Sequence, residues 1–123
     1  MATKAKVTYP KRGEVYVVNF DPTLGAEIWK TRPALVIQNN IASRHSRITI
    51  VPAITPQVEQ PLYPTEVLIQ APEGGLKKDS VVLLNHVRSV DKRRLVRRLG
   101  TLRLETIEHV NQALSTSLGL ANL

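Results

Sequence analysis

The chain has 123 residues, of which 42% are hydrophobic and none is cysteine. This is the size and composition of one folded domain, and it excludes a disulfide scaffold, thiolate metal sites and a cysteine nucleophile. The lack of cysteine fits a reducing compartment, so we expect a cytoplasmic protein. No apolar run approaches the ~18 residues of a membrane span, and no apolar segment follows the basic amino end, so neither a membrane anchor nor a signal peptide is expected.

Positive charge is concentrated in two segments. Seventeen Lys and Arg residues against ten Asp and Glu residues give a net charge of +7. Residues 1–12 hold four cations and no acid, and residues 88–103 hold seven cations against Asp91 alone, which makes +4 and +6. A dense basic stretch in a folded domain predicts a polyanionic or acidic partner, although a face kept positive for solubility would have the same composition.

The amino-terminal third predicts a tail, a strand and a long loop. Residues 1–10 are expected to be a flexible tail and residues 11–123 a single domain. β-Branched and aromatic residues predict a strand over residues 14–20 that is covered on both sides. Residues 21–31 contain proline and glycine and little periodicity, so they predict a long loop, and loops of that length in a compact domain are often functional.

Short segments with turn residues between them fill the middle of the chain. Strands are expected over 34–38, 48–54, 65–69, 80–84, 86–90 and 96–102, and the segments 80–84 and 86–90 could instead form one bent strand. The polar residues 43–47 and the proline-rich residues 56–64 are expected to be connections, and residues 72–75 a turn. Pro52 must lie at a bulge or an unpaired edge, because proline cannot donate a ladder hydrogen bond.

Two helical segments are expected near the carboxyl end. Asp91 can cap a single turn over residues 91–95. An amphipathic helix is predicted by an apolar stripe at spacings of 3, 4 and 4 residues, with Gly119 at its carboxyl-terminal cap; the stripe is Ile107, Val110, Leu114 and Leu118. Many short strands followed by one helix predict a mainly β fold, a small curled sheet or barrel with the helix packed on it.

The common catalytic and metal-binding motifs are missing. There is no HExxH, no glycine-rich phosphate loop and no GxSxG, and the three histidines do not have metal-ligand spacing, so a metalloenzyme or nucleotide hydrolase is not expected. His45 and His109 are expected to be ordinary surface side chains. His86 stands where two apolar segments meet, so it could be a structural histidine or a site residue.

Polar residues at the ends of predicted strands suggest a site. Arg32 precedes the second strand, Thr55 follows the third, and Asn85 and His86 lie between two strand segments. Strand ends hold reactive groups rigidly. If these ends converge, a guanidinium, a hydroxyl, an amide and an imidazole surround one space, and that set suits a phosphate.

Six short sequence blocks follow one another along the chain, and their order is characteristic. They are Arg-Gly-Glu-Val-Tyr (12–16), Asp-Pro-Thr-Leu-Gly-Ala-Glu (21–27), Thr-Arg-Pro-Ala-Leu-Val-Ile (31–37), Pro-Ala-Ile-Thr (52–55), Val-Arg-Ser-Val-Asp-Lys-Arg-Arg-Leu (87–95) and Ser-Leu-Gly-Leu (117–120). In this order, and over about residues 11–120, the chain resembles the MazF/PemK family of toxin endoribonucleases.

The resemblance implies both a fold and an activity. The implied fold is an SH3-like barrel with a C-terminal helix, working as a homodimer. The implied activity is metal-independent cleavage of single-stranded RNA, often mRNA, to 2′,3′-cyclic phosphate and 5′-hydroxyl ends, without a cofactor. This activity inhibits translation and growth, and a cognate antitoxin with an acidic, flexible segment neutralises the toxin.

The family's site residues carry over position by position. The arginine of the Arg-Pro block is Arg32, and the threonine of the Ala-Ile-Thr block is Thr55. The loop around Gly25 and Glu27 gates access of substrate and antitoxin. The expected RNA-binding residues are Gly25, Glu27, Trp29, Lys30, Thr31, Pro56, Asn85 and Arg88. Aromatic residues are few, so Trp29 is either a stacking platform for a base or an anchor that pins the loop.

The chain departs from the family pattern at two places. Ala26 stands where serine is frequent, and Ile28, Trp29 and Lys30 stand where a glutamine is frequent. Asn85 and His86 replace an acidic residue and a glutamine. Both departures lie at expected RNA contacts, so they concern base preference more than fold.

RNA cleavage of this type needs a deprotonated 2′-hydroxyl, a stabilised phosphorane and a protonated 5′-oxygen. Arg32 offers several fixed donors and a permanent charge, and Thr55 adds a hydroxyl donor. We expect His86 to assist proton transfer, because imidazole exchanges protons near neutral pH. The alternatives are a gyrase-poisoning toxin of the same fold and a non-catalytic nucleic-acid-binding barrel; the Arg32 and Thr55 blocks favour the nuclease.

Overall fold

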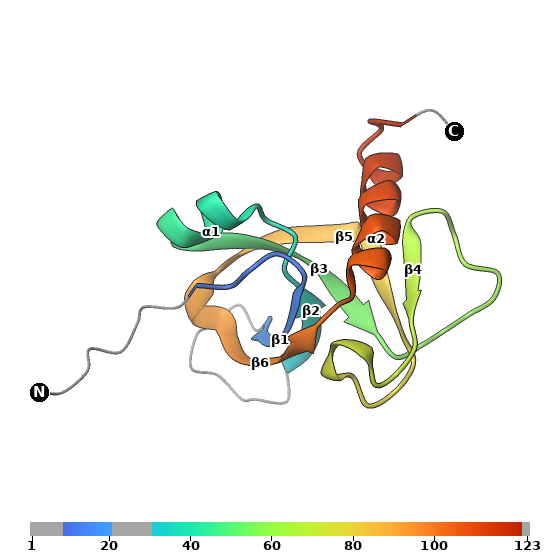
Figure 1. Cartoon of the computed structure of the whole chain (residues 1–123), viewed down its shortest axis with the longest axis horizontal. Helices are drawn as coiled ribbons and strands as arrows, with labels where there is room; N and C mark the ends of the chain where they lie inside the picture. Colours follow the sequence, from blue (N-terminus) through green and yellow to red (C-terminus); the bar gives the residue numbers. More distant parts are fainter. Residues whose placement is uncertain (1–8, 21–30, 122–123) are drawn as a thin grey trace, which may run out of the picture.

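The computed structural model describes residues 9–20 and 31–121 (Figure 1). Six antiparallel strands form one curled sheet in the order β4-β5-β3-β2-β1-β6. The strands are β1 (Glu14–Asn19), β2 (Thr31–Leu35), β3 (Ile48–Thr55), β4 (Glu66–Ile69), β5 (Ser80–Asp91) and β6 (Leu95–Thr101). The helices are α1 (Asn40–His45) and α2 (Leu104–Ser117), with the 3-10 turns η2 (Glu73–Gly75) and η3 (Lys92–Arg94). The expected mainly β fold with a C-terminal helix is confirmed.

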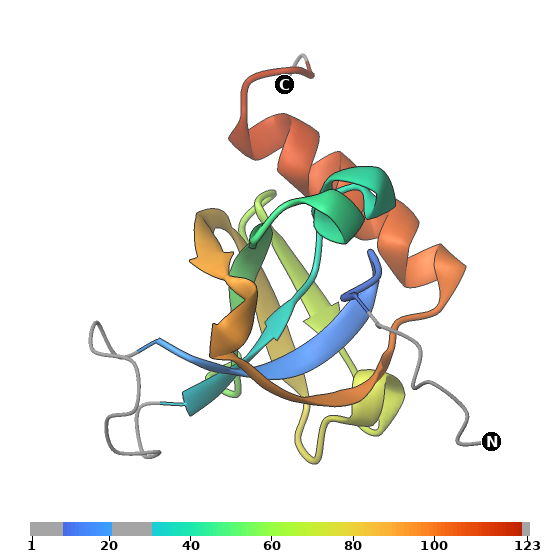
Figure 2. The ribbon, with the colours of Figure 1, turned by 90° about the vertical axis from the view of Figure 1, so that its left-hand side faces the viewer.

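One face of the sheet curls around a small apolar core, which we call the barrel core. Its buried members are Val18, Ala34, Val36, Val51 and Val90. Tyr16, Phe20 and Leu95 pack against them and are partly buried. Because these residues come from β1, β2, β3, β5 and β6 or the residues that follow them, the curl closes five strands around one interior (Figure 2).

The opposite face of the sheet packs against α2, which lies over β4 and β5 (Figure 1). Val110 and Ala113 are buried there in a second, larger apolar core, which we call the main core, and Ile107 and Leu114 pack against it and are partly buried. Leu118 is 58% exposed, so the apolar stripe is shorter than expected. The Gly119 cap is confirmed: its φ is +72°, and the Gly119 and Leu120 amides donate to the carbonyls of Thr116 and Ser115 at 3.2 and 2.8 Å.

Local expectations around Pro33, Pro52 and Asp91 had different outcomes. β2 begins at Thr31, three residues earlier than predicted, because Pro33 lies within the ladder opposite Val17. The register shift between Pro52 and Ile54 confirms a bulge. The Asp91 carboxylate accepts a hydrogen bond from the Arg93 amide at 2.8 Å, which confirms the predicted cap.

The prediction that residues 43–47 are a plain connection is wrong in part, because α1 includes His45. Asn39 caps this helix by accepting from the Ala42 amide at 2.9 Å, and the Ser43 hydroxyl is buried against Thr49 at 3.0 Å. A six-residue helix with one buried side chain has no apolar periodicity that could have marked it.

Three glycines dock η2 directly onto β6. Gly75 has a φ of +75°, and a Cβ atom there would stand 2.0 Å from the Leu99 carbonyl oxygen. A Cβ atom on Gly100 would stand 2.6 Å from the carbonyl carbon of Gly74. The backbones of the two segments are therefore in contact, which is possible only without side chains at these positions.

Most of the expected amino-terminal tail and nearly all of the expected loop after β1 lie outside the described residues. Residues 1–8, 21–30 and 122–123 lie outside them. Tyr9 is half-buried and Pro10 is buried, so the described structure begins close to the body of the domain.

Candidate active site at the end of β2 and β3

The pairing of β2 with β3 relates Arg32 to Thr55. β2 and β3 pair through Ala34 and Ala53. Continuing this antiparallel register by two residues brings Arg32 across from Thr55, on the same face as the two alanines. Arg32 is exposed and Thr55 is half-buried, and each lies two residues from the paired alanine of its strand.

Thr55 also borders a cavity of about 400 Å³ at the end of β3. The cavity lies between the 56–65 connection and the outer face of β4 and β5, and Gln57, Tyr63, Glu66 and Leu83 are among its lining residues. The Thr55 hydroxyl oxygen accepts from the Gln57 amide at 3.2 Å, which fixes its position at the rim. Space for a group larger than a water molecule therefore adjoins the hydroxyl.

Asn85 and His86 lie in a bend of β5. Pro52 of β3 faces Val87, but Ile54, only two residues further, faces Val82. Two steps along β3 thus correspond to five along β5, and the extra residues bulge outward. Asn85 and His86 are both exposed in this bulge. The bend lies on the other side of β3 from β2, so three neighbouring strands carry Arg32, Thr55 and the Asn85–His86 pair.

Arg88 is held by an aromatic ring. Its guanidinium carbon lies 4.9 Å from the centre of the Phe20 ring, within cation–π distance. Phe20 directly follows β1 and packs on the barrel core. Arg88 faces Val51, and Arg32 faces Val18, and both valines belong to the barrel core. The two arginines therefore project from the same face of the curled sheet.

The other expected RNA-binding residues are only partly described. Thr31 is the half-buried first residue of β2, opposite Asn19, and Pro56 is exposed directly after β3. Gly25, Glu27, Trp29 and Lys30 lie outside the described residues. Sequence reasoning missed Tyr63, which is 71% exposed at the rim of the cavity beside Thr55. Its position in the proline-rich 56–64 segment was the available signal, since an aromatic side chain in such a connection has little core to enter.

The comparison with protein families decides the identity of the chain. The family of PemK-like, MazF-like toxins of type II toxin–antitoxin systems matches residues 11–118. This chain belongs to the PemK/MazF toxin family.

Individual relatives agree with this assignment. The endoribonuclease EndoA of Bacillus subtilis is 44% identical over 110 residues, which cover 89% of this chain and 95% of that protein. The endoribonuclease MazF of Staphylococcus saprophyticus is 39% identical and covers 89% and 92%. Among solved structures, an endoribonuclease from a mycobacterial species superposes with a TM-score of 0.76 at 25% identity, covering 94% of this chain and 97% of that one.

A further solved structure is relevant to partners. It is an endoribonuclease in complex with its cognate antitoxin, also from a mycobacterial species, with a TM-score of 0.73 at 26% identity. It covers 93% of this chain and 99% of that chain. The PemK/MazF chain described here therefore has a fold similar to that of an endoribonuclease solved with its cognate antitoxin.

The basic stretch 88–103 of this PemK/MazF toxin is not one continuous surface. Arg93, Arg98 and Arg103 form ion pairs with Asp91, Glu14 and Glu73 at 3.1, 3.1 and 3.4 Å. The Lys92 ammonium donates to the Ser43 carbonyl at 2.7 Å, and Arg94 donates to the Asn19 carbonyl at 3.2 Å. Several of these cations therefore join separate elements of the toxin, and only some of the formal charge stays available to a partner.

Burial and neighbouring charges shift the pKa values of several groups in these elements. Hydrogen bonds from Arg93 lower the pKa of Asp91 from an ordinary 3.8 to about 2. Burial raises the pKa of Tyr16, and the neighbouring Glu14 carboxylate raises it further. Both shifts arise from contacts within the fold, and Arg32 is not among their causes.

The described residues were also compared with the requirements of a metal centre and a membrane span. Among them, no three His, Asp or Glu side chains come together in a way that could hold a metal ion. None of their helices is long and apolar enough to cross a membrane. His45 and His109 are exposed, as expected.

Proposed function

We propose that this chain is an endoribonuclease toxin that cleaves single-stranded RNA without a metal and leaves 2′,3′-cyclic phosphate and 5′-hydroxyl ends. The observation that supports the proposal most is the 44% identity to a relative named as an endoribonuclease, and the pairing of Ala34 with Ala53, two residues from Arg32 and Thr55, is consistent with it. The toxin acts as a homodimer in the cytoplasm, and a cognate acidic antitoxin neutralises it. The antitoxin-bound relative supports this part of the proposal.

The proposed chemistry uses charge stabilisation as its main contribution. Arg32 donates hydrogen bonds to the non-bridging oxygens of the phosphorane, and the Thr55 hydroxyl donates to the same group. Arg32 is assigned charge stabilisation alone in this proposal. His86, in the β5 bend, assists proton transfer to or from the reacting oxygens.

The Phe20–Arg88 contact supports a role for Arg88 in binding. An aromatic face fixes the direction of the guanidinium without consuming its hydrogen-bond donors. Arg88 then contacts a phosphate next to the one that is cleaved. Asn85, exposed beside His86, contacts a base or a ribose at the same bend.

One experiment tests the activity. The purified chain is incubated with a long single-stranded RNA in EDTA, the fragment ends are mapped, and single-stranded DNA of the same sequence serves as the control. We expect defined cuts with cyclic phosphate ends in RNA only. A requirement for magnesium contradicts the metal-free scheme. RNA that is bound but left intact favours the non-catalytic barrel. In a parallel reaction with gyrase and double-stranded DNA, trapped DNA–gyrase complexes favour the gyrase poison.

A pair of arginine variants tests the site. Arg32→Ala should lower the cleavage rate at least about 10²- to 10³-fold, the usual loss on removing a charge-stabilising donor. Arg47→Ala removes an equally exposed arginine at the α1 end and should cleave normally. Cleavage by Arg32→Ala at the normal rate refutes its role.

A histidine variant tests the proposed proton transfer. For His86→Gln, an unchanged rate and an unchanged pH profile would remove His86 from the mechanism.

A further inference from the structure

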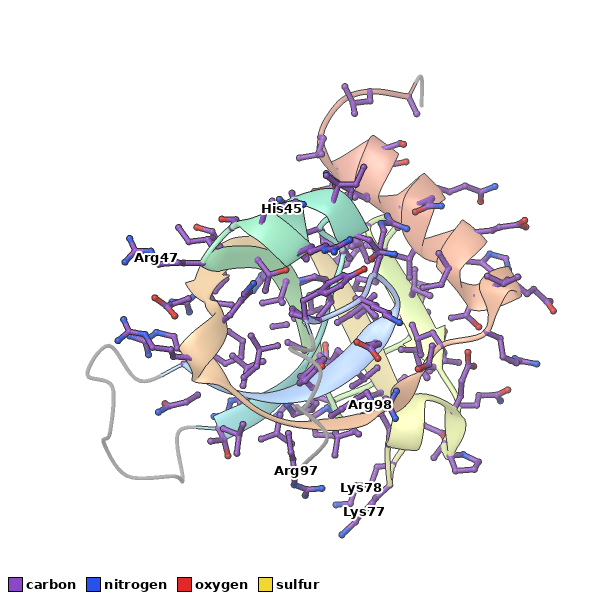
Figure 3. All side chains as sticks on the ribbon, turned by 60° about the vertical axis from the view of Figure 1, so that its left-hand side comes forward. His45, Arg47, Lys77, Lys78, Arg97 and Arg98 are labelled. Atoms are coloured by element: carbon purple, nitrogen blue, oxygen red, sulfur yellow. The ribbon has the colours of Figure 1, made fainter. Side chains whose placement is uncertain are left out.

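Three exposed cations gather at one end of the molecule, away from α1. They are Lys77 and Lys78, which follow η2, and Arg97 of β6. Figure 3 shows their side chains projecting from the same end, opposite the end that carries His45 and Arg47. We call these three residues the η2–β6 patch.

Backbone packing fixes the place of the two lysines. The contact of Gly74 and Gly75 with Leu99 and Gly100 docks η2 on β6, as described above. Leu76, directly before Lys77, is only 6% exposed and anchors the segment in the main core. The Ser80 hydroxyl donates to the Lys78 carbonyl at 2.9 Å. The patch therefore has a rigid base, although its side chains are free to turn.

Neighbouring carboxylates do not neutralise the patch. Asp79 is adjacent in sequence, but its carboxylate accepts from the Ala71 amide at 2.9 Å. Glu14, which lies near β6, pairs with Arg98 instead of Arg97. Within residues 9–20 and 31–121, none of the ion pairs involves a member of the patch.

The register of β1 connects the patch to the candidate active site. Val17 lies between Pro33 of β2 and Arg97 of β6. Arg97 is therefore two strand spacings, about 10 Å, from the residue that follows Arg32. Arg32 points to the barrel-core face and Arg97 to the other face, so an RNA chain leaving Arg32 reaches the patch by passing around the edge of the sheet that β6 forms.

We infer that the η2–β6 patch is a second contact for the phosphate backbone of single-stranded RNA, beyond the cleaved phosphate. The inference rests on the proposed function, because it extends the same RNA path. Lysine and arginine side chains on a fixed backbone bind phosphate oxygens without reading bases, so the patch adds affinity and not sequence preference. An RNA that is too short to pass around the β6 edge of the sheet does not reach the patch.

The test compares two RNA lengths. The probes carry a 2′-deoxy group at the cleavage position mapped with the wild-type chain, so that they bind without being cut. One probe has about six nucleotides and spans only the candidate active site, and the other has about thirty. Affinity is measured over a range of salt for the wild type, for Lys77→Gln/Lys78→Gln/Arg97→Gln, and for Lys11→Gln/Arg44→Gln/Arg47→Gln, which removes three exposed cations around α1.

The expected result is a loss that depends on length. The patch variant should bind the long RNA roughly tenfold to a hundredfold more weakly near 0.1 M salt, with a log–log salt slope smaller by up to about 2, because each phosphate contact contributes about 0.7. It should bind the short RNA as the wild type does. It should also cleave a short RNA that lacks the 2′-deoxy group at the wild-type rate. The control variant should keep the wild-type affinity for both probes.

Three outcomes overturn the inference. They are unchanged binding of the long RNA, an equal loss for both lengths, and the same loss in the control variant. A patch variant that binds long RNA normally but has lost affinity for a polyglutamate peptide assigns the patch to an acidic protein segment and also overturns the inference. If the wild type neither binds nor cuts RNA, the proposed function itself has failed, which is a distinct result.

Discussion

Single side chains in this molecule divide into those that hold the fold and those that remain available. Arg98 and Arg103 are engaged with Glu14 and Glu73, and Arg93 with Asp91. Arg32 instead is exposed on β2. The residue after it, Pro33, restricts the backbone of Arg32 to an extended shape. A cation on a stiff backbone is well suited to stabilise charge that develops at a fixed point.

The Thr55 hydroxyl can be tested without changing the shape of its side chain. Thr55→Val keeps the volume and removes the donor, so the rate of RNA cleavage in single-turnover assays should fall about 10²-fold or more. Thr55→Ser keeps the hydroxyl and should stay within about tenfold of the wild type. Both variants should unfold at the wild-type urea midpoint within error. If Thr55→Val cleaves as fast as Thr55→Ser, the hydroxyl has no catalytic role.

The lowered pKa of Asp91 predicts that the free energy of unfolding depends on pH. Its pKa is about 2 in the folded chain, below the ordinary 3.8, so the ionised form is favoured by folding. Its contribution to stability is therefore complete above about pH 4 and is lost as the pH falls toward 2. Asp91→Asn keeps a side-chain oxygen for the cap but has no charge to titrate. In urea unfolding, the difference between wild type and variant should be present at pH 7 and disappear near pH 2; a difference that stays constant with pH contradicts this assignment.

At the scale of elements, the two most useful features are irregular. The β5 bend, with five residues against two on β3, exposes Asn85 and His86 beside the strand that ends at Thr55. The glycine contact between η2 and β6 joins two segments that lie 25 residues apart in the chain, Gly75 and Gly100. Both features depend on how backbones pack and not on the periodicity of side chains.

Two glycines have almost the same φ value but different surroundings. Alanine variants at these two positions therefore separate the cost of steric overlap from the cost of backbone strain. Gly75 and Gly119 have φ values of +75° and +72°, but a Cβ atom at Gly119 would meet nothing within 4 Å. Gly119→Ala should therefore lower the free energy of unfolding by only about 1 to 2 kcal/mol, the cost of a left-handed alanine. Gly75→Ala adds a clash with backbone and should cost about 3 kcal/mol or more. Equal losses in urea unfolding would show that η2 moves away from β6 at little cost.

At the scale of the whole molecule, charge of opposite sign lies on different sides. Glu66, Glu73 and Glu105 line a cavity of about 560 Å³ between β4 and α2, with Arg103 and His109. Many of the available cations are on α1, β5, β6 and the segment after η2. A polyanion is therefore attracted more to the η2–β6 patch than to the cavity beside α2.

RNA binding should accordingly be strongly dependent on salt. Four to six phosphate contacts predict a slope of about −3 to −4 in a plot of log affinity against log salt concentration. The measurement is a titration of fluorescent single-stranded RNA between about 50 mM and 500 mM salt. A flat response would mean that neither Arg88 nor the η2–β6 patch contacts phosphate.

Much of the fold was accessible from the sequence alone. Alternating and helical apolar patterns predicted the strands and α2, because these patterns record which side chains face a core. The Arg-Pro and Ala-Ile-Thr blocks marked Arg32 and Thr55, and Asp91 and Gly119 marked two caps. The short helix α1 was missed because it buries a single side chain, and β2 was started too late because proline hid its pairing with β1.

The sequence by itself determined the family, the order of the strands along the chain and the two residues on which the chemistry is proposed to depend. Only the tertiary structure decided that β2 pairs with β3 at Ala34 and Ala53, that several cations of the basic stretch join separate elements, and that the segment before Lys77 and Lys78 docks on β6. Local patterns arise from neighbours in the chain, and a sequence records them directly. Contacts between distant segments depend on strand register and on backbone packing, which no local pattern specifies.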